Sequence, residues 1–152
     1  TNALITEWLD EQLMHTPSRS SVFIGTDLNT GVGRRWDGEN NDELVSGDFD
    51  MVGRQSPAAD NLMDTASKHN LSFVNTFGKH NDTFYAAKGS SSRIDYIIMD
   101  QGIRPSIQHC TTNLPAATKL QLIEDYKLRD HVPLEVKVDY QLRSETSKRR
   151  TT

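Results

Sequence analysis

The order of apolar patterns along the chain constrains its fold more than any other feature. Residues 3–15 and 57–69 repeat apolar side chains at helical spacing. The other apolar segments are short, rich in β-branched or aromatic residues and bounded by turn residues, as strands are. They are 21–25, 71–77, 83–87, 93–99, 106–112 and 132–140. This order predicts an α/β domain with mainly one mixed or antiparallel sheet and helices on one side of it.

The two helices are expected to cover one face of that sheet. The apolar face of the first helix would consist of Leu4, Ile5, Trp8, Leu9 and Leu13. The second helix follows the capping residue Ser56 and is expected to bury Leu62, Met63 and Ala66. The opposite face of the sheet is then expected to be an exposed apolar surface.

Net charge, cysteine content and the length of the apolar runs limit the classes of protein to which this chain can belong. The formal net charge of −4 argues against an electrostatic DNA clamp, which would show a basic face, but it does not exclude a nucleic-acid partner. Cys110 is the only cysteine, so neither an internal disulfide nor a cysteine zinc site can form, and a reducing, intracellular compartment is expected. No apolar run approaches the roughly 18 residues of a membrane helix, and no signal-peptide pattern opens the sequence.

Three short polar clusters lie at the edges of apolar runs and contain the candidate catalytic residues. They are Thr26-Asp27-Leu28-Asn29, Ser92-Arg93-Ile94-Asp95-Tyr96 and Arg129-Asp130-His131-Val132-Pro133-Leu134. Strand ends that present Asp, Asn and His to one place suit metal-assisted phosphodiester chemistry.

Asp27 and Asn29 are two positions apart, so in a strand both would point to the same side. A carboxylate there can orient water or accept its proton, and an amide can donate to a phosphate oxygen. The alternative is that the two residues simply begin the loop that follows, because Asp and Asn are favoured in turns.

Asp95 and Asp130 are the acids that would serve the candidate histidine, His131. A histidine that contacts phosphate needs a carboxylate to fix its tautomer, and Asp95 lies in an otherwise apolar strand. Asp130 suggests a ligand for Mg²⁺, which prefers carboxylate oxygens. The alternatives are an ion pair between Asp95 and Arg93 and a purely structural His131.

In order and content, the three clusters resemble the endonuclease/exonuclease/phosphatase superfamily, whose fold is the DNase I-like four-layer α/β sandwich. The run from Asn75-Thr76-Phe77 through Thr83-Phe84-Tyr85 to Ser92-Arg93-Ile94-Asp95-Tyr96-Ile97-Ile98 looks most like the endonuclease domains of non-LTR retrotransposons and craniofacial-development-protein-like relatives. The resemblance implies that residues 1–140 are the C-terminal portion of one such domain and that residues 141–152 are a basic tail.

The resemblance also implies an activity, the Mg²⁺-dependent hydrolysis of DNA by an endonuclease, with Mn²⁺ as an alternative ion. The products would carry a 3′-hydroxyl and a 5′-phosphate. Asp27 would activate or orient the attacking water, Asn29 would hold a phosphate oxygen, and Asp130 would contribute to the metal site.

The remaining implied roles concern the scissile phosphate and the substrate around it. His131 would contact that phosphate and stabilise charge in the transition state, with Asp95 orienting the ring. Phe84 and Arg93 would contact substrate. Ser92 replaces the aromatic residue that precedes the Arg-x-Asp motif in abasic-site enzymes, which argues against abasic-site specialisation.

The metal-binding Glu and the early Asn of the family belong to a first half that this sequence does not contain. The chain, which starts at Thr1, is therefore expected to be a fragment that is weak or inactive alone. The alternatives are a non-catalytic remnant or binding module of the same fold and a phosphatase of the superfamily. The expected partners are DNA and the missing N-terminal half or reverse transcriptase region of a parent polypeptide, and the location would be nuclear if the chain is retrotransposon-derived.

Overall fold

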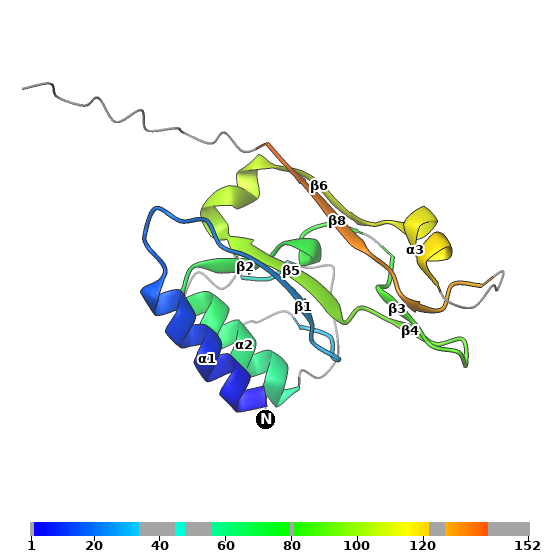
Figure 1. The fold of residues 1–152 in the computed structure, drawn as a ribbon, viewed down its shortest axis with the longest axis horizontal. Coiled ribbons are helices and arrows are strands. Elements are labelled where there is room, and N and C mark those ends of the chain that lie inside the picture. The colour runs from blue at the N-terminus through cyan, green and yellow to red at the C-terminus, as the bar shows by residue number, and fades with distance from the viewer. Residues whose placement is uncertain (1, 34–44, 48–55, 80, 122–126, 140–152) are drawn as a thin grey trace, which may run out of the picture.

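A computed structural model describes residues 2–33, 45–47, 56–79, 81–121 and 127–139 of the chain. These residues form an α/β structure of helices and antiparallel sheets (Figure 1). Most of the long loop after the first strand and the predicted basic tail at 141–152 lie outside the described residues. Within the described part, no helix is both long enough and apolar enough to cross a membrane.

The central sheet has the strand order β1-β5-β2, and both of its pairs are antiparallel. Its strands are β1 (Phe23–Asp27), β5 (Asp95–Asp100) and β2 (Leu71–Phe73). The register places Asp27 directly opposite Asp95. Because opposite residues of an antiparallel pair share a face, two candidate carboxylates meet at one end of this sheet.

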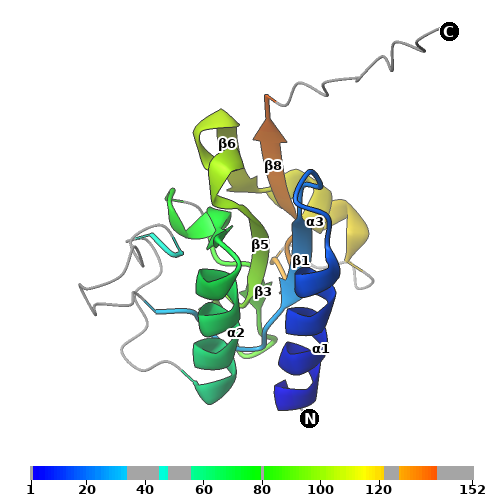
Figure 2. The same ribbon diagram turned by 90° about the vertical axis from the view of Figure 1, so that its left-hand side faces the viewer.

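Helices α1 (Asn2–His15) and α2 (Pro57–Lys68) lie side by side against one face of the central sheet (Figure 2). The predicted inward residues of α2 are buried in a core with Phe73, Tyr96 and Ile98. Of the predicted apolar face of α1, only Leu9 and Leu13 pack against that core. The others, Leu4, Ile5 and Trp8, are exposed, so this part of the prediction is wrong.

The other face of the central sheet is covered by a second sheet. This sheet pairs β6 (Ile107–Thr112) with β8 (Leu134–Val138). Ile97 and Met99 of β5 belong to the core that includes Val136 and Val138. The prediction of an exposed apolar face is therefore wrong for β5. On the edge strand β1, however, Phe23 is 55% exposed.

A third sheet, of order β4-β3-β7, holds the remaining strands. These are β3 (Phe84–Tyr85), β4 (Ser91–Ser92) and β7 (Asp130–His131), and the turn between the first two contains Gly89 at φ +89°. The register sets Phe84 opposite His131 and Tyr85 opposite Asp130. The described strands thus form three small sheets rather than the one that the sequence predicts.

Two local elements explain why a single sheet does not form. The predicted strand 71–77 ends at Phe73 and continues as the 3₁₀ helix η2 (Val74–Thr76), where the Thr76 hydroxyl donates to the Phe73 carbonyl at 2.6 Å. A second 3₁₀ helix, η3 (Gln101–Ser106), turns the chain between β5 and β6. The short helix α3 (Leu114–Leu120), capped by Asn113, was not predicted.

Candidate active site

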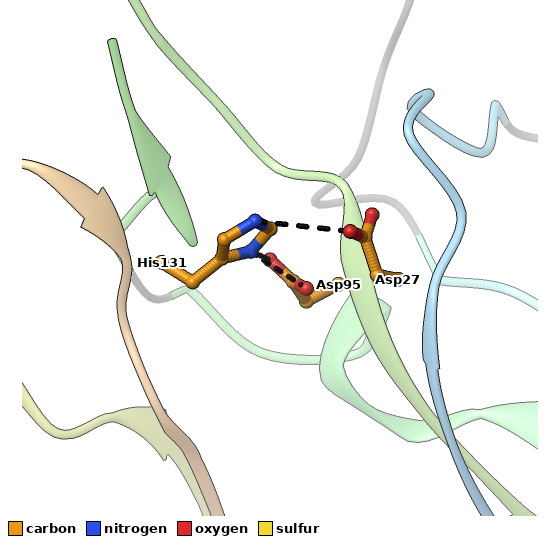
Figure 3. A group of neighbouring side chains, drawn as sticks. All are labelled: Asp27, Asp95 and His131. Carbon is orange, nitrogen blue, oxygen red and sulfur yellow. Dashed lines mark hydrogen bonds and ion pairs between the residues drawn. The ribbon is translucent and has the colours of Figure 1, made fainter. Parts of the chain in front are cut away.

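Asp27, Asp95 and His131 come together from three strands (Figure 3). Asp27 ends β1, Asp95 begins β5 and His131 ends β7. Each residue offers one potential ligand atom, and these atoms all lie within 4.8 Å of one another. Residues far apart in the chain therefore share one site.

The two ring nitrogens of His131 have different surroundings. Nδ1 lies 3.0 Å from both carboxylate oxygens of Asp95. Nε2 faces Oδ2 of Asp27 at 3.7 Å and Oδ1 of Asp130 at 3.8 Å. Since a carboxylate only accepts hydrogen bonds, Nδ1 donates to Asp95 and Nε2 is the nitrogen available to a substrate.

These acids set the protonation of the imidazole. Burial of the ring alone would lower the pKa of His131, but the hydrogen bond to Asp95 and the charges of Asp95, Asp27 and Asp130 outweigh it. The pKa of His131 is therefore raised above its ordinary value. The surrounding acids therefore favour the positively charged form of the ring.

The chain just after β1 holds Asp27 in place. The backbone N–H of Asn29 donates to Oδ1 of Asp27 at 2.9 Å, and Asn29 has a φ of +53°, a left-handed conformation that Asn tolerates better than most residues. Leu28 N–H donates to the Ile94 carbonyl at 2.8 Å, which ties this turn to the segment before β5. Oδ2 of Asp27 is the oxygen that faces His131.

An open groove of about 540 Å³ runs past the site. Asp27, Asp95 and His131 line one part of it, and the segment from Val132 to Leu134 lines another. Asn29 instead lines a neighbouring hollow between α1, β1 and α2. The structure thus brings the two acids and the histidine into one groove and places Asn29 beside it.

The other predicted site residues lie around this cluster. Asp130 is 76% exposed at a left-handed φ of +67°, and its metal role stays a prediction. The Phe84 ring lies against His131 with centroids 5.1 Å apart. Arg93 is half-buried, with a buried Nε atom, and its carbonyl accepts from the Tyr96 hydroxyl at 2.9 Å. The predicted substrate contacts of Phe84 and Arg93 also stay predictions.

Two residues at this site have no role in the sequence-based prediction, namely Asn75 and Thr83. Both are fully buried, and both hydrogen-bond to the backbone of Asp95. They lie 20 and 12 positions before it in the chain. The sequence signal for them is weak, because each has another polar residue beside it, Thr76 after Asn75 and Asp82 before Thr83.

The donor set fits a hard cation in part. Mg²⁺ prefers carboxylate oxygens, and Asp27, Asp95 and Asp130 supply them. Both oxygens of Asp95 lie at hydrogen-bonding distance from His131, however. Among the described residues, the group whose ligand atoms lie close enough together to share one ion is Asp27, Asp95 and His131, and it does not include Asp130.

Comparisons with known proteins support the fold. No protein-family model and no curated protein matches the chain. Among solved structures, the 3′-5′ exonuclease NExo from Neisseria meningitidis is similar, with a TM-score of 0.58 and 15% identity. A structure of a variant of the 3′ phosphatase NExo from Neisseria, bound to a product DNA hairpin, gives a TM-score of 0.56 and 15% identity.

Both matches cover 91% of this chain but 52% of the other chain. The chain therefore spans about half the length of these structures. At this level of identity the likeness shows a shared fold. It therefore supports the predicted α/β fold, while the superfamily stays a prediction.

Proposed function

We propose that this chain carries part of the active site of a metal-dependent phosphodiester hydrolase that acts on DNA. The observation that carries the proposal is the arrangement around His131. Its Nδ1 is held by Asp95, while its Nε2 faces Asp27 in an open groove. The fold shared with NExo, a 3′-5′ exonuclease and 3′ phosphatase whose structure with a product DNA hairpin is known, supports this class of reaction.

The geometry assigns complementary tasks to the three residues. Protonated His131 donates from Nε2 to a non-bridging oxygen of the scissile phosphate and stabilises the charge that develops there. Asp95 fixes the ring and stabilises its positive charge through the 3.0 Å contacts. Asp27, whose Oδ1 is occupied by the Asn29 N–H, keeps Oδ2 to orient the attacking water and accept its proton.

The remaining predicted residues complete the proposal. Asp130 would contribute to the site of the divalent cation, Mg²⁺ or Mn²⁺, which would neutralise phosphate charge when bound. The Asn29 amide would hold a phosphate oxygen at the edge of the groove, where its backbone already contacts Asp27. Phe84 and Arg93 would contact the nucleotides on either side.

More specifically, we propose that the chain is part of an endonuclease of the non-LTR retrotransposon type and that this enzyme acts in the nucleus. The support is the motif run from Asn75 to Ile98. In that case a further N-terminal half would supply the missing metal ligands and complete a four-layer sandwich. The helix layer and the two stacked sheets described above are consistent with three of those layers.

Two other activities of the same site follow from the neighbours. NExo is described as a 3′-5′ exonuclease and as a 3′ phosphatase, and both reactions would need the same acids and histidine. A substrate panel separates them. Supercoiled plasmid reports internal nicking, a 3′-hydroxyl strand reports exonuclease action, and a 3′-phosphorylated strand reports phosphatase action.

The test is metal-dependent turnover of that panel by the chain and by the polypeptide extended at its N-terminus. Asp27→Ala and His131→Ala are each expected to lower the rate by at least about 100-fold, the usual scale of acid–base catalysis. His109→Ala is the matched control, since His109 also lies near a carboxylate, Glu135 at 3.5 Å, but outside the cluster. EDTA is expected to abolish the reaction.

Two results would contradict the proposal. One is activity that survives both substitutions, because the cluster would then not be the active site. The other is an inactive extended polypeptide on every substrate with either ion, which would favour the non-catalytic remnant.

A further inference from the structure

Both backbone polar groups of Asp95 are held by side chains rather than by a neighbouring strand. Asn75 Nδ2 donates to the Asp95 carbonyl at 3.1 Å. The Thr83 hydroxyl oxygen accepts from the Asp95 N–H at 3.1 Å. Asn75 and Thr83 are both 0% exposed, so water does not replace these contacts.

The topology of the central sheet explains why these side chains are needed. On one edge, β5 pairs with β1 along its length, but on the other edge β2 reaches only from Asp100 to Ile98. Among the described strands, none pairs with the backbone from Ile94 to Ile97 on this second edge. Asn75 Oδ1 accepts from Ile97 N–H at 2.9 Å, and the Thr83 hydroxyl also accepts from Ile94 N–H at 3.0 Å.

Thr83 also contacts the segment that carries the histidine. Its carbonyl accepts from the Val132 N–H at 2.6 Å, immediately after His131. The next residue, Phe84, is paired with His131 in the sheet and lies against its ring. Thr83 is thus bonded through its hydroxyl to the Asp95 segment and through its carbonyl to the His131 segment.

We propose that Thr83 is a positioning residue for Asp95 and His131. Its buried hydroxyl fixes the backbone of Asp95 and thereby the orientation of the His131 ring. The proposal rests on the proposed function for its effect on rate, but not for its effect on the ring. Without the hydroxyl, two buried N–H groups would lose their acceptor, and the start of β5 would have to move to satisfy them. The Asp95 carboxylate would move with it.

Three variants separate positioning from simple stability. Thr83→Val keeps the shape of the side chain and removes the acceptor, whereas Thr83→Ser keeps the acceptor and removes a methyl group. Thr76→Val is the matched control. Thr76 is also 0% exposed, and its hydroxyl accepts from Gly47 N–H at 2.7 Å and donates to the Phe73 carbonyl, but it does not contact Asp95.

The readout is the pair of ring ¹⁵N chemical shifts of His131 in the whole labelled chain, at one fixed pH with EDTA. They are detected through the carbon-bound ring protons and assigned with His131→Gln. At a pH high enough for the ring to be neutral, the wild type is expected to show its hydrogen localised on Nδ1. Thr83→Val should shift both signals towards those of an unrestrained histidine, and Thr83→Ser and Thr76→Val should retain the wild-type values.

Unchanged His131 shifts in folded Thr83→Val would overturn the proposal, as would an equal change in Thr76→Val. If Thr83→Val does not fold, Thr83→Ser decides. Wild-type shifts in that variant support the hydroxyl as the positioning group, and altered shifts overturn it.

A rate measurement adds the catalytic consequence. Where the wild type cleaves DNA, Thr83→Val is expected to lower kcat by about 10- to 100-fold with little change in KM, as misplacement of a catalytic group does. An unchanged kcat together with shifted ring signals would contradict the link to catalysis. Failure of the N-terminally extended wild-type polypeptide to cleave any substrate would refute the proposed function alone, because the ring signals would still decide the role of Thr83.

Discussion

At the scale of single residues, the site depends on how one imidazole is surrounded. His131 is held by Asp95 at one nitrogen and faces Asp27 and Asp130 at the other. Phe84 lies against the ring and limits its rotation. Such a histidine favours its protonated form, which is the form that can stabilise charge on a phosphate.

The raised pKa of His131 predicts how the stability of the chain depends on pH. The folded-state pKa lies above the ordinary value of 6.5, so the folded chain binds this proton more tightly than the unfolded chain does. The stabilisation is present in full below the unfolded-state pKa, and it is lost as pH rises through the folded-state pKa. Because the side chain is 42% exposed, its size is expected to be below about 1 kcal/mol.

Urea unfolding of the wild type and of His131→Gln, in EDTA and between about pH 5.5 and 8.5, checks this prediction. The difference in unfolding free energy should shrink as pH rises. His109→Gln serves as the control for loss of an exposed histidine near a carboxylate. A difference that stays constant or grows with pH would show that the acids around His131 do not stabilise its charge.

At the scale of elements, the 3₁₀ helix η2 is in close contact with another segment of the chain. Gly47, which is buried, lies against the 3₁₀ helix η2, and its N–H donates to the Thr76 hydroxyl at 2.7 Å. A Cβ atom at this position would lie 2.7 Å from the Cα of Phe77 and against the Thr76 carbonyl. Only glycine fits here without moving η2.

Gly47→Ala is therefore expected to destabilise the fold by about 1–3 kcal/mol, the usual cost of overpacking. Gly102→Ala is the matched control, because a Cβ there meets nothing within 4 Å. Chemical unfolding of both variants measures the difference. Equal stability of the two would mean that the segment around Gly47 does not pack as described.

Sequence periodicity predicted those helices and strands whose apolar pattern lies within one continuous segment. Both long helices, the strand before Asp27 and the last strand were expected close to their observed bounds, and α2 buries the residues that its spacing indicates. Helix α3 was missed because it has only seven residues and rests on the Asn113 cap rather than on a repeated apolar face. The strand at 71–77 was overextended because its residues favour strands, whereas Thr76 bonds back to Phe73.

The sequence predicted some residues of the candidate site and missed others. The motifs named Asp27, Asp95 and His131, which lie together in the structure. The contacts of Asn75 and Thr83 with Asp95 could not be read from the sequence, because they join segments whose pairing depends on the tertiary fold. For the same reason the division into three sheets was not foreseen.

At the scale of the whole molecule, the described residues form two cores, and the chain spans about half the length of its structural neighbours. Its exposed large apolar side chains lie mainly on α1, including Leu4, Ile5 and Trp8. These side chains add little to the stability of the described fold, because they remain in water. The interior, in contrast, is concentrated between α2 and the central sheet.

This contrast gives a prediction for the two helices. Trp8→Gln is expected to change the unfolding free energy by less than about 0.5 kcal/mol, because Trp8 is 59% exposed. Leu62→Ala in α2 is expected to cost about 2–5 kcal/mol, since Leu62 is 9% exposed in the core. Chemical unfolding measures both values. A loss of stability in Trp8→Gln comparable to that in Leu62→Ala would contradict the described placement of α1.

The proposed active site is a property of the whole molecule, because β1, β5 and β7 must all be in place to form it. The most direct test is a double-mutant cycle on metal-dependent plasmid nicking, with wild type, Asp27→Ala, His131→Ala and the double variant. If both residues serve one reaction centre, the double variant should be about as slow as the slower single variant. Losses that multiply fully, or nicking that survives the double substitution, would contradict a shared catalytic site.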